Sequence, residues 1–150
     1  MFRVSKQQII FGGNYYTDIL PVASGWIVWD KKLTEVSRDD FGDCELAWCS
    51  KGTNRIFRWL WRGFARKGSR NEESKVKLHP SQKPVGLLKK ILLFYTEDDD
   101  IIFDPFLGSG SLAVACELCG RNWVGVEIKE EYCKIAKQRL LIPSKQELLF

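Results

Sequence analysis

A glycine-containing turn, Asp104-Pro105-Phe106-Leu107-Gly108-Ser109-Gly110, joins an apolar run to a helical pattern and constrains this chain most strongly. The glycines at 108 and 110 let the backbone come close to a ligand, and the helix that follows offers unpaired N–H groups. Glu127 lies nineteen positions after Gly108, at the expected tip of the next strand, where a carboxylate can accept both hydroxyls of a ribose. This arrangement predicts a site for a nucleoside-containing cofactor.

Two other interpretations of the same turn are open. A pair of glycines spaced in this way is often only a tight turn, and it is the surrounding strand, helix, second strand and terminal acid that favour a cofactor site. A dinucleotide fingerprint would continue to a third glycine at position 113, where this chain has Ala113. A nicotinamide-binding oxidoreductase is therefore a minor alternative.

The second half of the chain alternates helix and strand signals. Leu87, Leu88, Ile91, Leu92 and Tyr95 recur at helical spacing after Pro84, which predicts a helix that ends before the acidic turn at 97–100. A strand at 101–105, a helix at 111–119 closed by Gly120, a strand at 123–127 and a helix at 130–140 follow. Such a βαβα unit builds a parallel sheet covered by helices, so the fold class is α/β.

The first half is richer in strand signals. Short apolar runs at 8–11, 26–29 and 44–49 end at turn residues and predict three strands, and the aromatic run at 56–64 predicts a fourth. The polar stretch at 66–80 is typical of a surface loop. We interpret 1–150 as a single domain, with strands in 1–50, a basic aromatic segment and loop in 51–78 and the cofactor-binding unit in 79–142.

Basic charge is concentrated in one segment. Residues 51–70 carry seven basic side chains and no acidic one, whereas the rest of the chain has 16 basic and 19 acidic residues. Arginines interleaved with aromatic rings suit phosphate contacts with stacking on bases. The alternative is that the rings are core and the arginines a solvated face. The candidate DNA-binding residues are Arg55, Arg58, Trp59, Trp61, Arg62 and Arg66.

Composition argues against several other classes of protein. No stretch approaches the ~20 apolar residues of a membrane span, and the first residues lack the apolar core of a secretory signal, so we expect a cytosolic protein. The five cysteines are an odd number without paired spacing, which predicts free thiols. Cys116 and Cys119 have no second pair to complete a zinc site, and no metal site is expected.

A third motif, His79-Pro80-Ser81-Gln82-Lys83-Pro84, precedes the first helix of the second half. A histidine, a glutamine and a lysine at a proline-stiffened helix start can bind a carboxylate through their donors and the positive helix end. Taken alone, His79 is more typical of an ordinary loop histidine.

These motifs together resemble a known family. HPSQKP before an apolar helix, then DPFLGSG, then VGVEIKEEYCKIAKQRL is similar to the C-terminal half of DNA N6-adenine and N4-cytosine methyltransferases of the beta-type motif order, over residues 79–140. The first half resembles, more loosely, phage-encoded and prophage-encoded members. The resemblance implies a partial Rossmann-like fold with a mixed, mostly parallel sheet and helices on both faces.

The same resemblance implies S-adenosylmethionine as the cofactor and double-stranded DNA as the partner, in the cytoplasm of a bacterium or a phage-infected host. Glu127 would hold the ribose, and His79, Gln82 and Lys83 would lie close to the same pocket. The methionine and adenosyl parts would be lined by Asp104, Pro105, Phe106, Gly108, Ser109 and Gly110.

The chain departs from the family in one respect. Members carry an Asp-Pro-Pro-Tyr or similar tetrapeptide that accepts hydrogen bonds from the target amino group and stacks on the flipped base, and no such sequence occurs here. We therefore assign no catalytic residue and expect a truncated or split enzyme, to which a second polypeptide can supply the motif. The alternative is a non-catalytic DNA-binding or cofactor-binding module. The sequence leaves open whether adenine or cytosine is the target.

Overall fold

The computed structural model describes residues 2–32, 42–62, 65–66, 79 and 81–141. The chain divides into two compact units, Met1–Lys67 and Gly68–Phe150. The division falls within the stretch at 66–80 that the sequence marks as a polar loop, most of which lies outside the described residues. Each unit is described by itself below.

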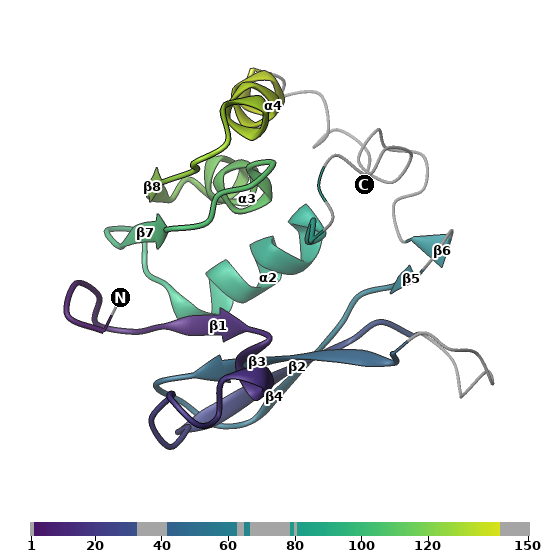
Figure 1. The fold of residues 1–150 in the computed structure, drawn as a ribbon, viewed down its shortest axis with the longest axis vertical. Helices are drawn as coiled ribbons and strands as arrows, with labels where there is room; N and C mark the ends of the chain where they lie inside the picture. Colours follow the sequence, from purple (N-terminus) through teal and green to yellow (C-terminus); the bar gives the residue numbers. More distant parts are fainter. Residues whose placement is uncertain (1, 33–41, 63–64, 67–78, 80, 142–150) are drawn as a thin grey trace. The chain divides into compact units, whose positions relative to one another are not determined.

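The first unit is built on a four-stranded sheet (Figure 1). Its order is β1-β3-β2-β4; β1 and β2 are antiparallel to β3, and β4 is parallel to β2. The three strands expected in 1–50 are confirmed. The elements are β1 (Ile9–Phe11), a short 3-10 helix η1 (Gly13–Tyr15), β2 (Gly25–Asp30), β3 (Cys44–Cys49) and β4 (Arg55–Arg58).

The core of this sheet follows from the two-residue period of strands. Along β2, Gly25, Ile27 and Trp29 are buried and alternate with half-buried residues. Trp48 of β3 is also buried, and its indole N–H donates to the Pro21 carbonyl at 2.9 Å. Burial of two tryptophans and their β-branched neighbours stabilises this sheet strongly, since each large side chain contributes about 2–3 kcal/mol when removed from water.

The expected strand at 56–64 is wrong as a single element. β4 ends at Arg58, and the chain continues as two-residue strands β5 (Trp61–Arg62) and β6 (Ala65–Arg66), which pair antiparallel with each other. The reason is that β2 ends at Asp30, the partner of Arg58, so β4 has no neighbour to continue along. Aromatic content alone could not indicate where the neighbouring strand stops.

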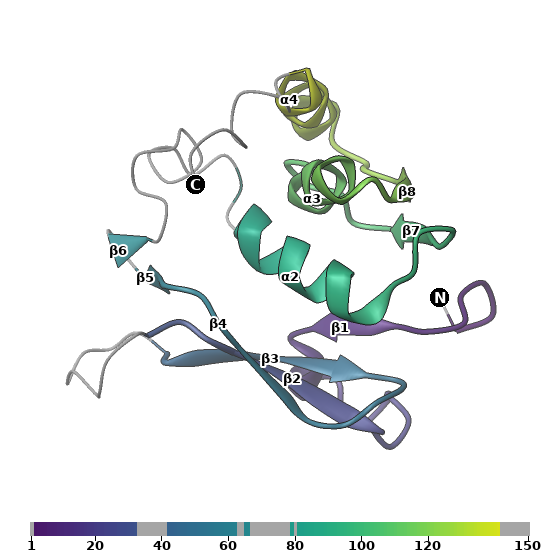
Figure 2. The same ribbon diagram turned by 180° about the vertical axis from the view of Figure 1, so that it is seen from behind.

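The second unit carries a two-stranded parallel sheet with three helices on one side of it, as Figures 1 and 2 show from opposite directions. Ile101 to Asp104 of the first strand pair in register with Asn122 to Gly125 of the second. The elements are α2 (Val85–Tyr95), β7 (Ile101–Asp104), α3 (Ser111–Cys119), β8 (Asn122–Gly125) and α4 (Glu130–Leu140).

Apolar spacing correctly places the helices of this unit. The bounds of α3 and α4 agree with the expected ones, and Gly120 ends α3 in the left-handed conformation with φ of 65°. Leu87, Leu88, Ile91 and Leu92 of α2 are buried, and α2 packs against the small residues of α3. Pro84 lies just before α2 rather than within its first turn.

Two details of the sheet differ from expectation. β8 ends at Gly125, two residues before Glu127, so the acid lies on the connection to α4 rather than on the strand. Among the described strands, three pairs are antiparallel and two are parallel, and the described helices cover one side of β7–β8. The fold is a mixed α/β fold, with less parallel pairing than the sequence suggests.

Candidate functional site

The glycine turn lies where β7 passes into α3, at the carboxyl end of the strand. Gly108 and Gly110 have φ of 54° and 78°, in the left-handed region that side chains disfavour. A Cβ atom at Gly110 would also lie 2.8 Å from the Cβ of Ala136 in α4. The turn is closed by a bond from the Gly110 N–H to the Leu107 carbonyl at 2.9 Å. Both glycines are therefore favoured by the backbone conformation of the turn itself.

Glu127 faces this turn directly. Its Oε2 accepts the Gly108 N–H at 2.8 Å, and its Oε1 accepts the Lys129 N–H at 2.9 Å. These backbone N–H groups, with Lys129 the larger contributor, hold the pKa of the Glu127 carboxyl below its ordinary value. The carboxylate is thus ionised and fixed in orientation at neutral pH.

Asp104 lies at the end of β7 beside the same turn. Its Oδ1 accepts the Phe106 N–H at 3.0 Å. Burial raises the pKa of this carboxyl, and the negative charge of Glu127 adds to the rise, while the Phe106 N–H opposes it. Two carboxylates in one small region favour a ligand that carries positive charge, because a cation offsets their repulsion.

His79 reaches the turn from the segment before α2. Its ring lies 3.5 Å from the position that a Cβ at Gly108 would occupy. Its Nδ1 accepts the Ser81 N–H at 3.1 Å, so the ring proton of the neutral histidine is on Nε2. The ring packs edge-on against Tyr132 of α4 with centroids 4.4 Å apart, and Lys129 lies over the ring of that tyrosine.

The structure therefore brings His79, Gly108 and Glu127 together, as the sequence predicts. The other predicted residues differ from one another in exposure and in hydrogen-bond partners. Phe106 is 81% exposed. The buried Ser109 turns its hydroxyl toward Arg139 rather than toward open space. Gln82 is buried beside His79 and donates its backbone N–H to the His79 carbonyl, and Lys83 Nζ donates to the Ser81 carbonyl at 3.3 Å.

Sequence reasoning missed three residues at this site, all on α4. Tyr132, Ala136 and Arg139 contact His79, Gly110 and Ser109, respectively. Their spacing of four and three residues places them on one face of the helix. This spacing was the available signal, but helical periodicity gives the face without showing what it packs against.

Comparison with known proteins identifies the family. The sequence model of the N6/N4 DNA methylase family matches residues 17–138. The chain belongs to this family. It is 33% identical over 129 residues to the type II methyltransferase M2.MboI of Moraxella bovis, a match that covers 86% of this chain and 44% of the relative. It is 42% identical over 114 residues to M2.LlaDCHI of Lactococcus lactis subsp. cremoris, covering 76% and 40%.

A solved structure supports the fold of this DNA methylase family member. The M1.HpyAVI–SAM complex superposes with a TM-score of 0.64 at 26% identity, over 89% of this chain and 74% of that one. The chain spans less than half of the length of the two curated relatives it matches. The matches make the oxidoreductase alternative untenable, since none of these relatives is of that class.

In this methylase chain the described part of the basic aromatic segment is anchored on β2. The Trp59 N–H donates to the Asp30 carbonyl at 2.9 Å, and the Trp29 indole donates to the Trp59 carbonyl at 3.0 Å. Arg55 is exposed, and Arg58 is exposed with its Nε 3.2 Å from Asp30 Oδ2. Trp59 and Trp61 are half-buried. The side chains of Arg62 and Arg66 lie outside the described part of the chain, so their predicted role is untested.

A cavity of about 420 Å³ lies at the start of β8, lined by Glu117, Gly120, Arg121, Asn122 and Trp123. The strand runs from there toward the glycine turn, so the cavity is at the opposite end of the strand. The Trp123 indole donates to Glu117 Oε1 at 2.8 Å, and the Arg121 guanidinium donates to Thr96 Oγ1 at 3.1 Å. The Trp123, Glu117 and Arg121 side chains of this cavity thus make hydrogen bonds within the local structure.

No group of three or more metal-ligating side chains occurs within the described residues. Burial raises the pKa of the Cys116 thiol to about 12, which keeps it protonated and a poor metal ligand. None of the helices in the described part of the chain has the length and apolar character that crossing a bilayer requires.

Proposed function

We propose that this chain binds S-adenosylmethionine and contributes the cofactor site of a DNA methyltransferase that modifies adenine N6 or cytosine N4. The observation that carries the proposal is the bond from the Gly108 N–H to Glu127 Oε2, which joins the glycine turn to the acid. Support comes from the family match and from the solved relative, whose structure is a SAM complex.

Each part of the site has a task in binding. The Glu127 carboxylate, ionised and fixed by two backbone N–H groups, accepts the ribose hydroxyls. Because Gly108 and Gly110 have no side chains, a ligand can come close to the backbone of the turn. The ring of His79 lies beside the same space. Asp104 offsets part of the cofactor's positive charge. The bound cofactor supplies a sulfonium methyl group that an amino nitrogen can attack.

The reaction needs an acceptor for the target amino group, which is a poor nucleophile while conjugated to its ring. The sequence contains no Asp-Pro-Pro-Tyr or equivalent tetrapeptide. We propose that a segment bearing this motif, on the same or on a second polypeptide, completes the site. The exposed apolar side chains of β7 and β8, among them Ile101 and Val124, support this role because a neighbouring element can bury them.

For the DNA contact, we propose the basic aromatic segment at 51–70. Arg55 and Arg58 present exposed guanidinium groups, and the ion pair between Arg58 and Asp30 at 3.2 Å is a surface pair that phosphate can replace at small cost. Trp59 and Trp61 are half-buried, so each residue keeps some exposed surface, and aromatic rings can stack on bases. A module that binds DNA or cofactor without catalysis is the second candidate, favoured by the missing tetrapeptide.

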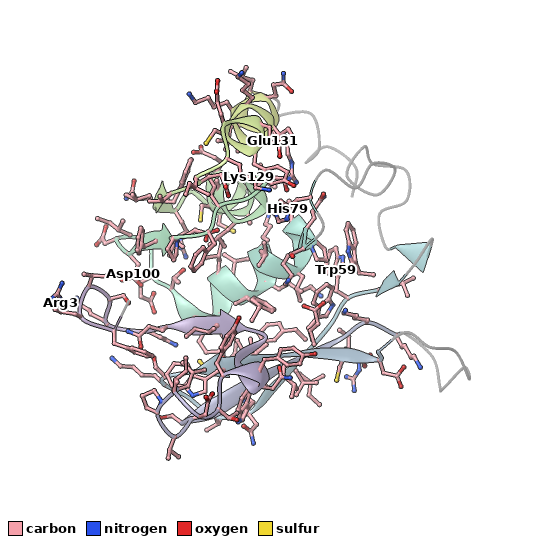
Figure 3. The ribbon with its side chains drawn as sticks, in the orientation of Figure 1. Arg3, Trp59, His79, Asp100, Lys129 and Glu131 are labelled. Atoms are coloured by element: carbon pink, nitrogen blue, oxygen red, sulfur yellow. The ribbon has the colours of Figure 1, made fainter. Side chains whose placement is uncertain are left out.

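Calorimetric titration with S-adenosylmethionine tests the cofactor proposal. Glu127→Ala removes acceptors for two hydroxyls, each bond contributing about 1.5–3 kcal/mol, so affinity should fall by about tenfold or more. Glu131→Ala is the matched control, since Glu131 is an exposed acid near the start of α4 (Figure 3). Equal affinity in the wild type and Glu127→Ala, or no binding by the wild type, would reject the assignment.

A further inference from the structure

The face of α4 that lies against the glycine turn ends at Arg139. From this residue a single nitrogen, Nη1, donates to the Ser109 carbonyl at 2.8 Å, to Ser109 Oγ at 3.1 Å and to Ser111 Oγ at 3.0 Å. Both serines are buried, at 3% and 7% exposed. Three contacts within 3.1 Å from one charged donor to buried acceptors are a strong restraint on the turn.

The charge of Arg139 is not there to stabilise the helix it touches. Ser111 is the first residue of α3, and a cation beside the start of a helix opposes the helix dipole. Helix starts are usually stabilised by a capping side chain, yet Gly110 caps α3 without one. Besides its own backbone bond from Gly110 to Leu107, the turn between β7 and α3 is thus held by a side chain of a different helix.

Ala136 shows why this fastening affects the ligand side of the turn. A Cβ at Gly110 would lie 2.8 Å from the Ala136 Cβ, so α4 already touches the backbone of the turn. Arg139, one helical turn further on, donates hydrogen bonds to the two serines that flank Gly110. The positions of Gly108 N–H and of the carboxylate bonded to it, Glu127, depend on where the turn is held.

We propose that Arg139 is a positioning residue for cofactor binding: it fixes the turn at Ser109 and Ser111 so that Gly108 and Glu127 keep the spacing that the cofactor requires. The inference rests on the proposed binding of S-adenosylmethionine. Arg139 does not touch the cofactor itself. A lysine keeps the positive charge and has N–H donors but lacks the planar guanidinium geometry, so it supplies only part of the restraint.

The test uses the full 150-residue chain and measures S-adenosylmethionine affinity by calorimetry well below each variant's melting temperature. Arg139→Ala should weaken binding about tenfold or more, Arg139→Lys should weaken it by less, and added methylguanidinium should restore part of the affinity of Arg139→Ala. Lys137→Ala is the control, because Lys137 is an exposed cation on the same helix, and its affinity should equal that of the wild type.

The outcomes separate this inference from the proposed function. A wild type that does not bind S-adenosylmethionine overturns the function, whereas a wild type that binds and an Arg139→Ala variant that binds equally well overturn only the role of Arg139. Lower stability without a change in affinity also overturns it, since that result shows a merely structural role. If Arg139→Ala does not fold, Ser111→Ala removes one acceptor and leaves α4 intact: weaker binding supports the inference, and unchanged affinity refutes it.

Discussion

The four-stranded sheet of the first unit and the β7–β8 sheet of the second unit bury their strands to very different degrees. In the first unit, Ile27 and Trp29 of the central strand β2 are 0% and 1% exposed. In the second unit, Ile101 of β7 and Val124 of β8 are 69% and 53% exposed. All four side chains are apolar, so residue type does not explain why their exposed fractions differ.

The strands also differ in how many neighbours each one pairs with. β2 pairs on both sides, with β3 and β4, whereas β7 and β8 pair only with each other in the described sheet. Parallel strands normally occur with both faces covered. The strand that carries the cofactor turn is thus supported on its helix side, and its other side is where a further element can pack.

The largest effect expected from this contrast is on methyl transfer. The isolated chain should transfer tritiated methyl groups to DNA at least about a thousandfold more slowly than a complete relative, because a fixed acceptor for the amino group contributes a factor of this order. Adding a fragment that bears the tetrapeptide and its strand should raise both transfer and melting temperature. Robust transfer by the chain alone, absent in an Asp104→Ala control preparation, would contradict the missing acceptor.

The second prediction compares the two sheets directly by stability. Trp29→Ala should lower the free energy of unfolding of the first unit by about 3–5 kcal/mol, because it opens a cavity in a fully buried core. Phe103→Ser on β7, at a side chain that is 41% exposed, should change the free energy of unfolding of the second unit by less than about 1 kcal/mol. Denaturant titrations of both variants measure these free energies, and similar losses of unfolding free energy would contradict the difference in burial between the two sheets.

The third prediction concerns the turn that the second sheet supports. Gly110→Ala should cost about 2–3 kcal/mol of stability, because it combines a left-handed backbone with a contact 2.8 Å from Ala136. Gly120→Ala has the same kind of backbone strain, but its Cβ would meet nothing within 4 Å, so it should cost only about 1 kcal/mol. Thermal unfolding of the pair measures the close approach by itself, and equal losses would show that packing against α4 is unimportant.

The fourth prediction belongs to the edge of the first sheet. The Arg58→Ala, Arg62→Ala double variant should bind duplex DNA more weakly. The slope of log affinity against log salt concentration should fall in magnitude by about two, since each phosphate contact contributes about 0.9 to it. Arg3→Ala, an exposed arginine of the same unit outside the basic segment, is the control. Fluorescence anisotropy across salt concentrations measures both, and a slope shared by all three proteins would assign the arginines to a solvated face.

The smallest effect is on the pH dependence of stability. Burial raises the folded-state pKa of Asp104 above its ordinary 3.8, so its contribution favours folding below pH 3.8 and is lost as the pH rises through the raised value. Glu127 has the opposite sign: its lowered pKa gives stability above pH 4.5 that is lost as the pH falls through the lowered value. Asp104→Asn should therefore raise the melting temperature slightly at pH 7 and not at pH 3.5. A decrease at pH 7 would reverse the assigned sign.

The sequence by itself determined the elements with strong local signals. Helical spacing and Gly120 fixed both ends of α3, because periodicity and a left-handed cap are properties of neighbouring residues. The glycine turn and Glu127 could also be predicted from the sequence. Glycine favours the positive φ of the turn, and the carboxylate follows it at a fixed spacing along the chain. These signals were enough to predict Gly108 and Glu127 as parts of one site, whereas His79 was expected there only from the family resemblance.

Only the tertiary structure decided what depends on partners distant in the chain. The end of β4 at Arg58 follows from the end of β2, and the exposure of β7 depends on what packs beside it. Neither feature can be predicted from the pattern of neighbouring residues in the sequence. Arg139 shows the same limit, because its bonds to Ser109 and Ser111 cross about thirty residues of sequence. Side-chain hydrogen bonds act over a few ångströms in space, so their partners appear only when the chain has folded.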